Sequence, residues 1–188
     1  MGHVSGLVLA AGAGRRFGGP KALARLNGVR LVDRAVAILA RGGCTDLLVV
    51  AGAAPLVVPG AEVVDNPEWQ SGMGSSLVAG LAHLAAGPSS AVVVLLVDTP
   101  WVGDRAVARL VAAHAAGAVA AQATYAGTPG QPVLLGREVW DDVAGLAVGD
   151  QGARGWLRTH RELVTAVACD GTGEDRDVDR PGDLISPP

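Results

Sequence analysis

Short apolar runs alternate along the chain with longer stretches in which apolar residues recur at helical spacing. The runs predict strands at Val4–Leu9, Leu47–Val50, Glu62–Val64, Ala91–Val97, Ala118–Thr124 and Val133–Leu135. The helical pattern predicts helices at Leu31–Ala40, Ser75–Ala86, Arg105–Ala115, Glu138–Ala144 and Ala153–His160. Because strands and helices alternate with short connections, we expect an α/β fold with a largely parallel sheet that is covered on both faces.

Composition narrows this expectation to one compact domain over residues 1–188. A chain of 188 residues can bury one sizeable core, and its length alone argues against a second domain. Hydrophobic residues make up 49% of the chain but aromatic residues only 3%, so the core must consist mainly of Ala, Val and Leu. Such a composition is typical of a buried parallel sheet.

The charge pattern excludes several kinds of partner. The net charge is −3 and no basic run is present, which disfavours nucleic acid and acidic membrane surfaces. No apolar run reaches 18 residues and no secretory leader precedes the first strand, so we expect a soluble, cytoplasmic protein. Cys44 and Cys169 lack the spacing of a metal or redox motif and are expected to be free, buried thiols.

The connection after the first predicted strand, from Ala10 to Lys21, concentrates the chemistry of the chain. It holds Gly12, Gly14, Gly18 and Gly19 together with two arginines and a lysine. Glycines let backbone N–H groups approach a ligand closely, and the cations supply fixed positive charge. A polyanion such as a nucleoside triphosphate would use both.

Two better-known phosphate loops do not fit this segment. The dinucleotide fingerprint needs an acidic residue at the end of the next strand, but Leu47–Val50 runs into Ala51-Gly52. Pro20 also prevents a helix from starting where that fold requires one. A Walker loop is excluded because Lys21 is followed by Ala22 and not by a hydroxyl residue. An ordinary glycine-rich turn is the alternative.

A carboxylate follows the most apolar predicted strand. Asp98 comes directly after the run that ends at Val97, and ligands of such sheets lie beyond the carboxyl ends of the strands. Desolvating a carboxylate costs free energy unless it has a partner, and a metal ion would be a natural one. The alternative is that Asp98 caps the following helix, although Pro100 and Trp101 stand between them.

Two further segments carry polar chemistry. Gly72-Met-Gly74 leads into Ser75 and Ser76, which either cap a helix or present hydroxyl and N–H groups to a ligand. The segment from Gly171 to Asp183 is rich in Asp and Gly; it is either a solvated acidic tail or a segment that folds back with a second carboxylate set. Trp69 and Trp101 are expected mainly to pack, although both lie in loops near this region.

The loop Leu9-Ala-Ala-Gly-x-Gly-x-Arg-Phe-Gly-x-x-Lys21 resembles the signature loop of nucleotidyltransferases related to molybdenum-cofactor cytidylyl- and guanylyltransferases. Further matches cover nearly the whole chain: Asp98-Thr-Pro100, Asn66-Pro-x-Trp-x-x-Gly-Met-x-x-Ser-Leu77, Gly130-Gln-Pro-Val-Leu134, Gly149-Asp-x-Gly-Ala-Arg154 and Asp177-Val-Asp179-x-Pro181. The resemblance implies a three-layer, Rossmann-like fold of the nucleotide-diphospho-sugar transferase type. It departs at Thr99, where cytidylyl members often carry Gln, and at Gln131, where His is frequent.

The resemblance also implies roles for particular residues. Catalysis is assigned to Lys21, Arg16 and Asp98. Mg²⁺ would bind to Asp98 and Asp179, with Asp177 as the alternative second ligand. Nucleotide binding falls on Leu9, Ala10, Ala11, Gly12, Gly14, Arg15, Arg16, Lys21, Asn66, Gly74, Ser75, Ser76 and Asp98. The acceptor would meet Gly130, Gln131, Pro132, Asp150 and Arg154, although Asp150 could instead cap a helix and Arg154 could form a surface ion pair.

The implied reaction is transfer of a nucleoside monophosphate from a triphosphate to an acceptor phosphate, with release of pyrophosphate. In the family, Leu-Ala-Ala-Gly accompanies CTP and Leu-Ala-Gly-Gly accompanies GTP, so Ala11 favours CTP. A molybdopterin-type acceptor, and a client molybdoenzyme as a partner, are implied by the resemblance alone. The alternatives are a GTP-dependent guanylyltransferase, a sugar-phosphate nucleotidyltransferase and a non-catalytic nucleotide-binding delivery factor for a molybdoenzyme.

Overall fold

The computed structural model describes residues 2–184. The strands are β1 (Val4–Leu9), β2 (Arg25–Leu26), β3 (Val29–Arg30), β4 (Leu47–Ala51), β5 (Glu62–Asp65), β6 (Ala91–Leu96), β7 (Ala120–Tyr125), β8 (Thr128–Gly136) and β9 (Val164–Ala168). The α-helices are α1 (Leu31–Arg41), α2 (Met73–Ala85), α3 (Asp104–Ala115), α4 (Trp140–Leu146) and α5 (Arg154–Thr159). Short 3-10 helices are η1 (Lys21–Leu23), η2 (Trp69–Ser71), η3 (Arg137–Val139), η4 (Gly149–Gln151), η5 (Arg161–Leu163) and η6 (Pro181–Leu184).

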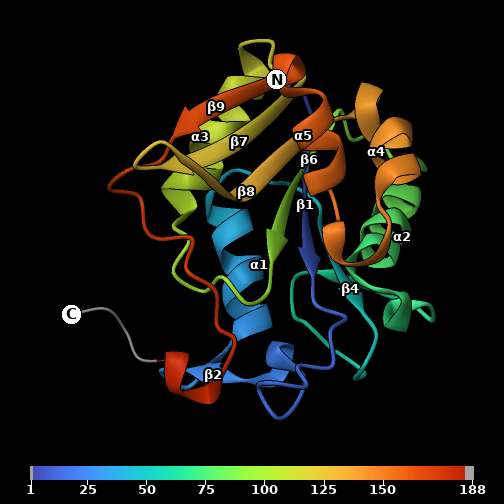
Figure 1. Cartoon of the computed structure of the whole chain (residues 1–188), viewed down its shortest axis with the longest axis vertical. Coiled ribbons are helices and arrows are strands. Elements are labelled where there is room, and N and C mark those ends of the chain that lie inside the picture. The colour runs from blue at the N-terminus through green and yellow to red at the C-terminus, as the bar shows by residue number, and fades with distance from the viewer. Residues whose placement is uncertain (1, 185–188) are drawn as a thin grey trace.

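One seven-stranded sheet runs through the described part of the chain in the order β5-β4-β1-β6-β8-β7-β9 (Figure 1). All neighbouring strands in it are parallel except at β8, which is antiparallel to both β6 and β7. After β1 the chain first builds outward through β4 and β5 and then returns to place β6 on the other side of β1. This reversal opens a crevice at the carboxyl ends of β1 and β6, where sheets of this kind bind ligands.

Two layers of helices bury the two faces of the sheet. Helices α1 and α3 pack on one face, while α2, α4 and α5 pack on the other (Figure 1). Both cores consist mainly of Ala, Val and Leu, and the central strands β1 and β6 are buried almost throughout. The predicted three-layer, mostly parallel α/β arrangement is therefore confirmed.

Several element boundaries differ from the prediction. Helix α2 begins at Met73, two residues before the predicted start, and α4 covers Trp140–Leu146 because η3 takes up the preceding turn. Strand β8 is longer than Val133–Leu135, since the turn at Ala126 and Gly127 folds it back along β7 as a hairpin. The alternation of strands and helices predicts parallel neighbours, so it gave no indication that β8 is antiparallel.

The prediction missed three strands. Strand β9 lies at the edge of the sheet and is largely exposed, so it lacks the continuous apolar run that marks a buried strand. The small hairpin of β2 and β3 turns at Asn27-Gly28, where both residues have positive φ. Asn-Gly is a strong hairpin signal, so the sequence did contain the information for this element.

The cysteine prediction is confirmed. Cys44 and Cys169 are both free and buried. Burial raises the pKa of the Cys44 thiol to about 12, which keeps it protonated and unreactive near neutral pH. Among residues 2–184, no helix combines the length and apolarity needed to cross a bilayer.

Candidate functional site

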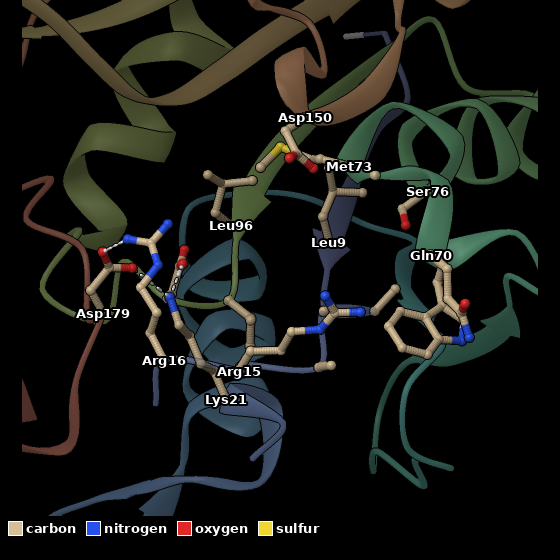
Figure 2. Close-up of a pocket in the computed structure, with 18 residues that line it drawn as sticks. Leu9, Arg15, Arg16, Lys21, Gln70, Met73, Ser76, Leu96, Asp150 and Asp179 are labelled. Atoms are coloured by element: carbon tan, nitrogen blue, oxygen red, sulfur yellow. Dashed lines mark hydrogen bonds and ion pairs between the residues drawn. The ribbon is translucent and has the colours of Figure 1, made fainter. Parts of the chain in front are cut away.

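Three segments that are distant in sequence meet at the carboxyl edge of the sheet (Figure 2). The glycine-rich loop follows β1, Asp98 follows β6, and the segment after β9 brings Asp179. Lys21, at the start of η1, lies between the two aspartates. The crevice left by the strand-order reversal is therefore lined by the charged residues that the sequence singled out.

The loop after β1 folds into a tight turn at Gly14. This residue has a φ of 60°, and its carbonyl oxygen accepts hydrogen bonds from the N–H groups of Gly18 at 2.9 Å and Gly19 at 3.2 Å. A Cβ at Gly14 would lie 2.0 Å from the carbonyl oxygen of Gly19, so a side chain does not fit there. No α-helix follows the loop until α1 at Leu31, which agrees with the exclusion of a dinucleotide fingerprint.

Lys21 bridges two carboxylates. Its Nζ donates to Oδ2 of Asp98 at 2.8 Å and to Oδ1 of Asp179 at 3.2 Å. Partial burial disfavours its charge, but the hydrogen bonds and charges of the two aspartates outweigh this, and the pKa of Lys21 is raised. The helix-capping alternative for Asp98 is wrong, because α3 begins at Asp104 and Gly103 stands at its cap position.

The two neighbouring arginines differ in what they contact. Nη1 of Arg16 donates to Oδ2 of Asp179 at 2.7 Å, although 77% of the Arg16 side chain remains exposed. No carboxylate within residues 2–184 pairs with Arg15, whose guanidinium extends away from Asp179 along the cavity (Figure 2). Arg15 therefore keeps its charge available for an anion.

Asp179 reaches the site because the C-terminal segment is anchored. The N–H of Val178 donates to the carbonyl oxygen of Asp98 at 2.8 Å, and the Val178 side chain is fully buried. Oδ2 of Asp183 accepts hydrogen bonds from the N–H groups of Asp179 at 2.9 Å and Arg180 at 2.7 Å. The segment thus folds back as one alternative predicted and is not a freely solvated tail.

The electrostatics of Asp179 follow from this placement. The hydrogen bond from Lys21, the charge of Lys21 and the charge of Arg16 hold the pKa of Asp179 below its ordinary value. Asp179, and not Asp177, is the carboxylate that lies beside Asp98 through Lys21, while Asp177 lines a neighbouring cavity.

The first cavity has a volume of about 520 Å³ and contains most of the predicted nucleotide-binding residues. Its lining includes Leu9, Ala11, Gly12, Gly14, Arg15, Arg16, Lys21, Ser76, Asp98, Asp150 and Asp179. Figure 2 shows the charged cluster of Lys21, Arg16 and Asp179 at one end, with Gln70 and Ser76 at the other. The cavity therefore has a strongly charged end and an uncharged polar end.

Four of the predicted nucleotide-binding residues do not line this cavity: Ala10, Asn66, Gly74 and Ser75. The buried Asn66 amide donates to the hydroxyls of Ser75 at 2.9 Å and Ser76 at 3.0 Å, and it accepts from the N–H of Glu68. These contacts fix the turn that leads into α2. A Cβ at Gly74 would lie 2.2 Å from the carbonyl oxygen of Ala147, so Gly74 permits a close backbone contact.

A second cavity of about 400 Å³ adjoins the first, and the two share Leu9, Met73, Leu96 and Asp98. Of the predicted acceptor residues, Gly130, Gln131 and Arg154 line this second cavity, whereas Pro132 does not. Asp150 instead lines the first cavity, and Ala153, not Asp150, stands at the N-cap position of α5. Asp98 thus stands where two adjacent binding spaces meet.

Several residues that line the cavities were not among the predicted site residues, although Trp69 was expected in a loop near the site. Trp69 and Gln70, both in η2, lie on the first cavity, and Gln122 and Gln151 lie on the second. The polar, glycine-flanked loop around Trp69 pointed to a ligand site, because a tryptophan there has few apolar residues to pack against. Nothing in the sequence pattern indicated that Gln122 and Gln151 would line a cavity.

The donor set fits a divalent cation. Among residues 2–184, no three His, Cys, Asp or Glu side chains form a metal cluster, so the protein itself would provide two carboxylates. Mg²⁺ commonly binds through one or two carboxylates together with substrate phosphates. The ammonium of Lys21 already stands in for a cation between Asp98 and Asp179, which shows that both carboxylates can face one positive centre.

Known proteins resemble this chain over most of its length. The family described as MobA-like NTP transferase domain matches residues 6–164. Nicotine blue oxidoreductase from Paenarthrobacter nicotinovorans is 39% identical over 93% of this chain and 92% of that protein. Molybdenum cofactor guanylyltransferase from Rhodobacter capsulatus is 35% identical over 59% of this chain and 59% of that protein.

Solved structures share the fold. The homologue of Rv0371c from Mycobacterium sp. strain JC1 superimposes with a TM-score of 0.80 at 32% identity, over 96% of this chain and 92% of that one. The manganese complex of Rv0371c from Mycobacterium tuberculosis H37Rv has a TM-score of 0.77 at 25% identity, over 94% of both chains. Solved nucleotidyltransferases also share this arrangement, which confirms the predicted nucleotide-diphospho-sugar transferase type.

Proposed function

The chain belongs to the family of MobA-like NTP transferase domains, and from this premise we propose that it transfers CMP from CTP to the phosphate of a molybdopterin-type acceptor. The observation that carries the proposal is the pair of adjoining cavities that share Asp98. A group can pass between two bound molecules only where their sites meet, and the charged cluster lies at this junction. The relative named molybdenum cofactor guanylyltransferase supports the choice of acceptor.

In the proposed reaction an oxygen of the acceptor phosphate attacks the α-phosphorus of the triphosphate. The new O–P bond forms as the bond to the β-phosphate oxygen breaks, and pyrophosphate leaves. Lys21, Arg15, Arg16 and the amides of the glycine-rich loop hold the phosphates and offset their charge. An anionic acceptor is already a nucleophile once it is positioned, so the reaction needs no Ser, Cys or His nucleophile.

Asp98 and Asp179 would hold a divalent cation, which we propose to be Mg²⁺. When bound, such a cation supplies charge neutralisation and alignment at the reacting phosphates. The manganese complex of Rv0371c supports a divalent metal in a related protein of this fold.

The acceptor end has chemistry that suits a ligand with hydrogen-bond donors. Oε1 of Gln131 is buried and lacks a hydrogen-bond partner within the described residues, and Gln131 lines the second cavity. A buried acceptor atom without a partner costs free energy, which a ligand N–H or O–H group would recover. Arg154 on the same cavity can pair with an acceptor phosphate.

The choice of CTP rests on the uncharged end of the first cavity. A Cβ at Gly52 would lie 2.8 Å from Cβ of Ala11 and 2.6 Å from Cβ of Trp69, so these three residues pack without spare room. Ala11, Trp69 and Gln70 line this end of the cavity, and we infer that the Ala11 methyl leaves room for a pyrimidine but not for the larger guanine.

Base preference provides the test of this proposal. In the presence of Mg²⁺ we expect CTP to raise the melting temperature more than GTP, ATP or UTP, because a ligand of the folded state stabilises it by mass action. The matched variant Ala11→Gly should reduce the CTP preference in favour of GTP. A clear preference of the unaltered protein for GTP would overturn the cytidylyl assignment, and no response to any nucleotide would count against nucleotidyl transfer itself.

A second candidate function is an oxidoreductase. The relative named nicotine blue oxidoreductase matches over nearly the full length of both chains. A pyrophosphate-bearing hydride donor could occupy the first cavity and a flat acceptor the second, with hydride passing between them and a proton taken from water. The absence of a dinucleotide fingerprint after β1 places this candidate second.

The two candidates separate in one assay. Oxidation of NADH or NADPH with nicotine blue as acceptor, without a nucleoside triphosphate, would favour the oxidoreductase. Pyrophosphate release that needs both a triphosphate and an acceptor would favour the transferase.

A further inference from the structure

The ammonium group of Lys21 occupies the point at which Asp98 and Asp179 converge. It lies 2.8 Å from Oδ2 of Asp98 and 3.2 Å from Oδ1 of Asp179. The Lys21 side chain is only 15% exposed, compared with 23% for Asp98 and 45% for Asp179. A divalent cation that used both carboxylates would need the space that the ammonium now fills.

The charges of this cluster are balanced. Arg16 pairs with the second oxygen of Asp179, so two cations face two carboxylates. The balance leaves no excess negative charge to attract a divalent cation. A cation that entered beside Lys21 would also be repelled by the ammonium at short range, where charge interactions are strongest.

We propose that Lys21 keeps the Asp98–Asp179 pair closed to divalent cations until a triphosphate draws its ammonium away. Phosphate oxygens offer the ammonium an equivalent partner, and the flexible lysine stem lets it change partners. The carboxylates are then free for the cation that arrives with the nucleotide. The triphosphate step rests on the proposed function, whereas the closed state rests on the contacts of Lys21 alone.

The test measures Mn²⁺ binding in the absence of nucleotide and acceptor. Electron paramagnetic resonance of free Mn²⁺ gives the Kd of the unaltered protein and of Lys21→Met, which removes the charge but keeps an extended side chain. We expect Lys21→Met to bind one Mn²⁺ at least about tenfold more tightly than the unaltered protein, because repulsion between the metal and the ammonium is gone. Its turnover should fall at the same time, so affinity and activity move in opposite directions.

Melting temperature gives a second readout. Without Lys21 the Asp98 carboxylate loses its ion pair and Asp179 keeps only its pair with Arg16, so Mn²⁺ alone should stabilise Lys21→Met and leave the unaltered protein almost unchanged. If Lys21→Met does not fold, Lys21→Gln serves the same purpose, because it is also uncharged and can still donate to one carboxylate.

Two controls identify the site. Arg41 forms an ion pair with Asp104 at 2.8 Å on the surface, so Arg41→Met also frees a carboxylate but should create no Mn²⁺ site. The double variant with Lys21→Met and Asp98→Asn should lose the site again. Equal Mn²⁺ affinity in the unaltered protein and the Lys21 variants would overturn the proposal, as would tight binding by Arg41→Met. Neither result depends on transferase activity, so the proposed function stands or falls separately.

Discussion

Replacing Asp98 by Asn should abolish most nucleotidyl transfer while the protein still folds. Asn keeps the size of the side chain and an oxygen that can accept from Lys21, but it removes the negative charge at the junction of the two cavities. Loss of a carboxylate that helps to position a metal and phosphates at the reacting centre should lower kcat at least about a hundredfold. Release of pyrophosphate from CTP in the presence of the acceptor measures this.

A matched surface variant makes this result specific. Asp104 lies in the first turn of α3 and pairs with Arg41, so Asp104→Asn removes one carboxylate charge away from the cavities. We expect its turnover to stay close to that of the unaltered protein, and both variants should show cooperative melting. Near-normal pyrophosphate release by Asp98→Asn would contradict a catalytic or metal-binding role for Asp98.

The part of the site formed by β1 and β6 could be predicted because both strands are strongly apolar. Such runs identify central parallel strands, and ligands lie beyond their carboxyl ends. This reasoning alone brings the glycine-rich loop close to Asp98, and the structure places Lys21 between that loop and Asp98. The charged residues at these strand ends then indicate a ligand-binding site, because a lysine or an aspartate has no packing role beside a buried sheet.

Asp179 could not be found in the same way. It lies 158 residues beyond Lys21, in a segment without helical or strand periodicity, and only the family resemblance pointed to it. Its position depends on the backbone hydrogen bond from Val178 to Asp98 and on the carboxylate of Asp183, which are tertiary contacts that no local pattern encodes.

The polar cluster before α2 shows another limit of sequence reasoning. Asn66, Ser75 and Ser76 have the hydrogen-bonding groups that a nucleobase would use, yet their side chains largely bond to one another. Whether a polar group serves a ligand or a turn depends on whether its partners are already present in the fold.

Asp150 and Arg154 show how backbone direction separates near neighbours. They lie four residues apart, a spacing that would place them on one face of a continuous helix. Gly152, with a φ of 52°, interrupts the helical conformation between η4 and α5. Asp150 therefore lines the first cavity and Arg154 the second. The two residues therefore do not form one acceptor-binding surface, because each lines a different cavity.

The two cations predicted to act in catalysis should contribute unequally. Lys21 is mostly buried and contacts both aspartates, whereas Arg16 is 77% exposed and contacts Asp179 alone. Lys21→Ala removes the cation that bridges the two carboxylates, so we expect kcat to fall at least about a hundredfold. Solvent screens the charge of an exposed side chain, so Arg16→Ala should weaken nucleotide binding or transfer by no more than about tenfold.

Calorimetric titration with a non-hydrolysable triphosphate, together with turnover, measures this difference, and Arg15→Ala serves as the comparison. Because Arg15 has no carboxylate partner within the described residues, its loss should weaken triphosphate affinity more than the loss of Arg16 does. All three variants should still melt cooperatively, since none of these side chains belongs to the hydrophobic core. Unchanged affinity and turnover in both Lys21→Ala and Arg16→Ala would refute triphosphate binding by the loop. An Arg16 defect as large as that of Lys21 would show that Arg16 leaves Asp179 to grip the triphosphate during the reaction.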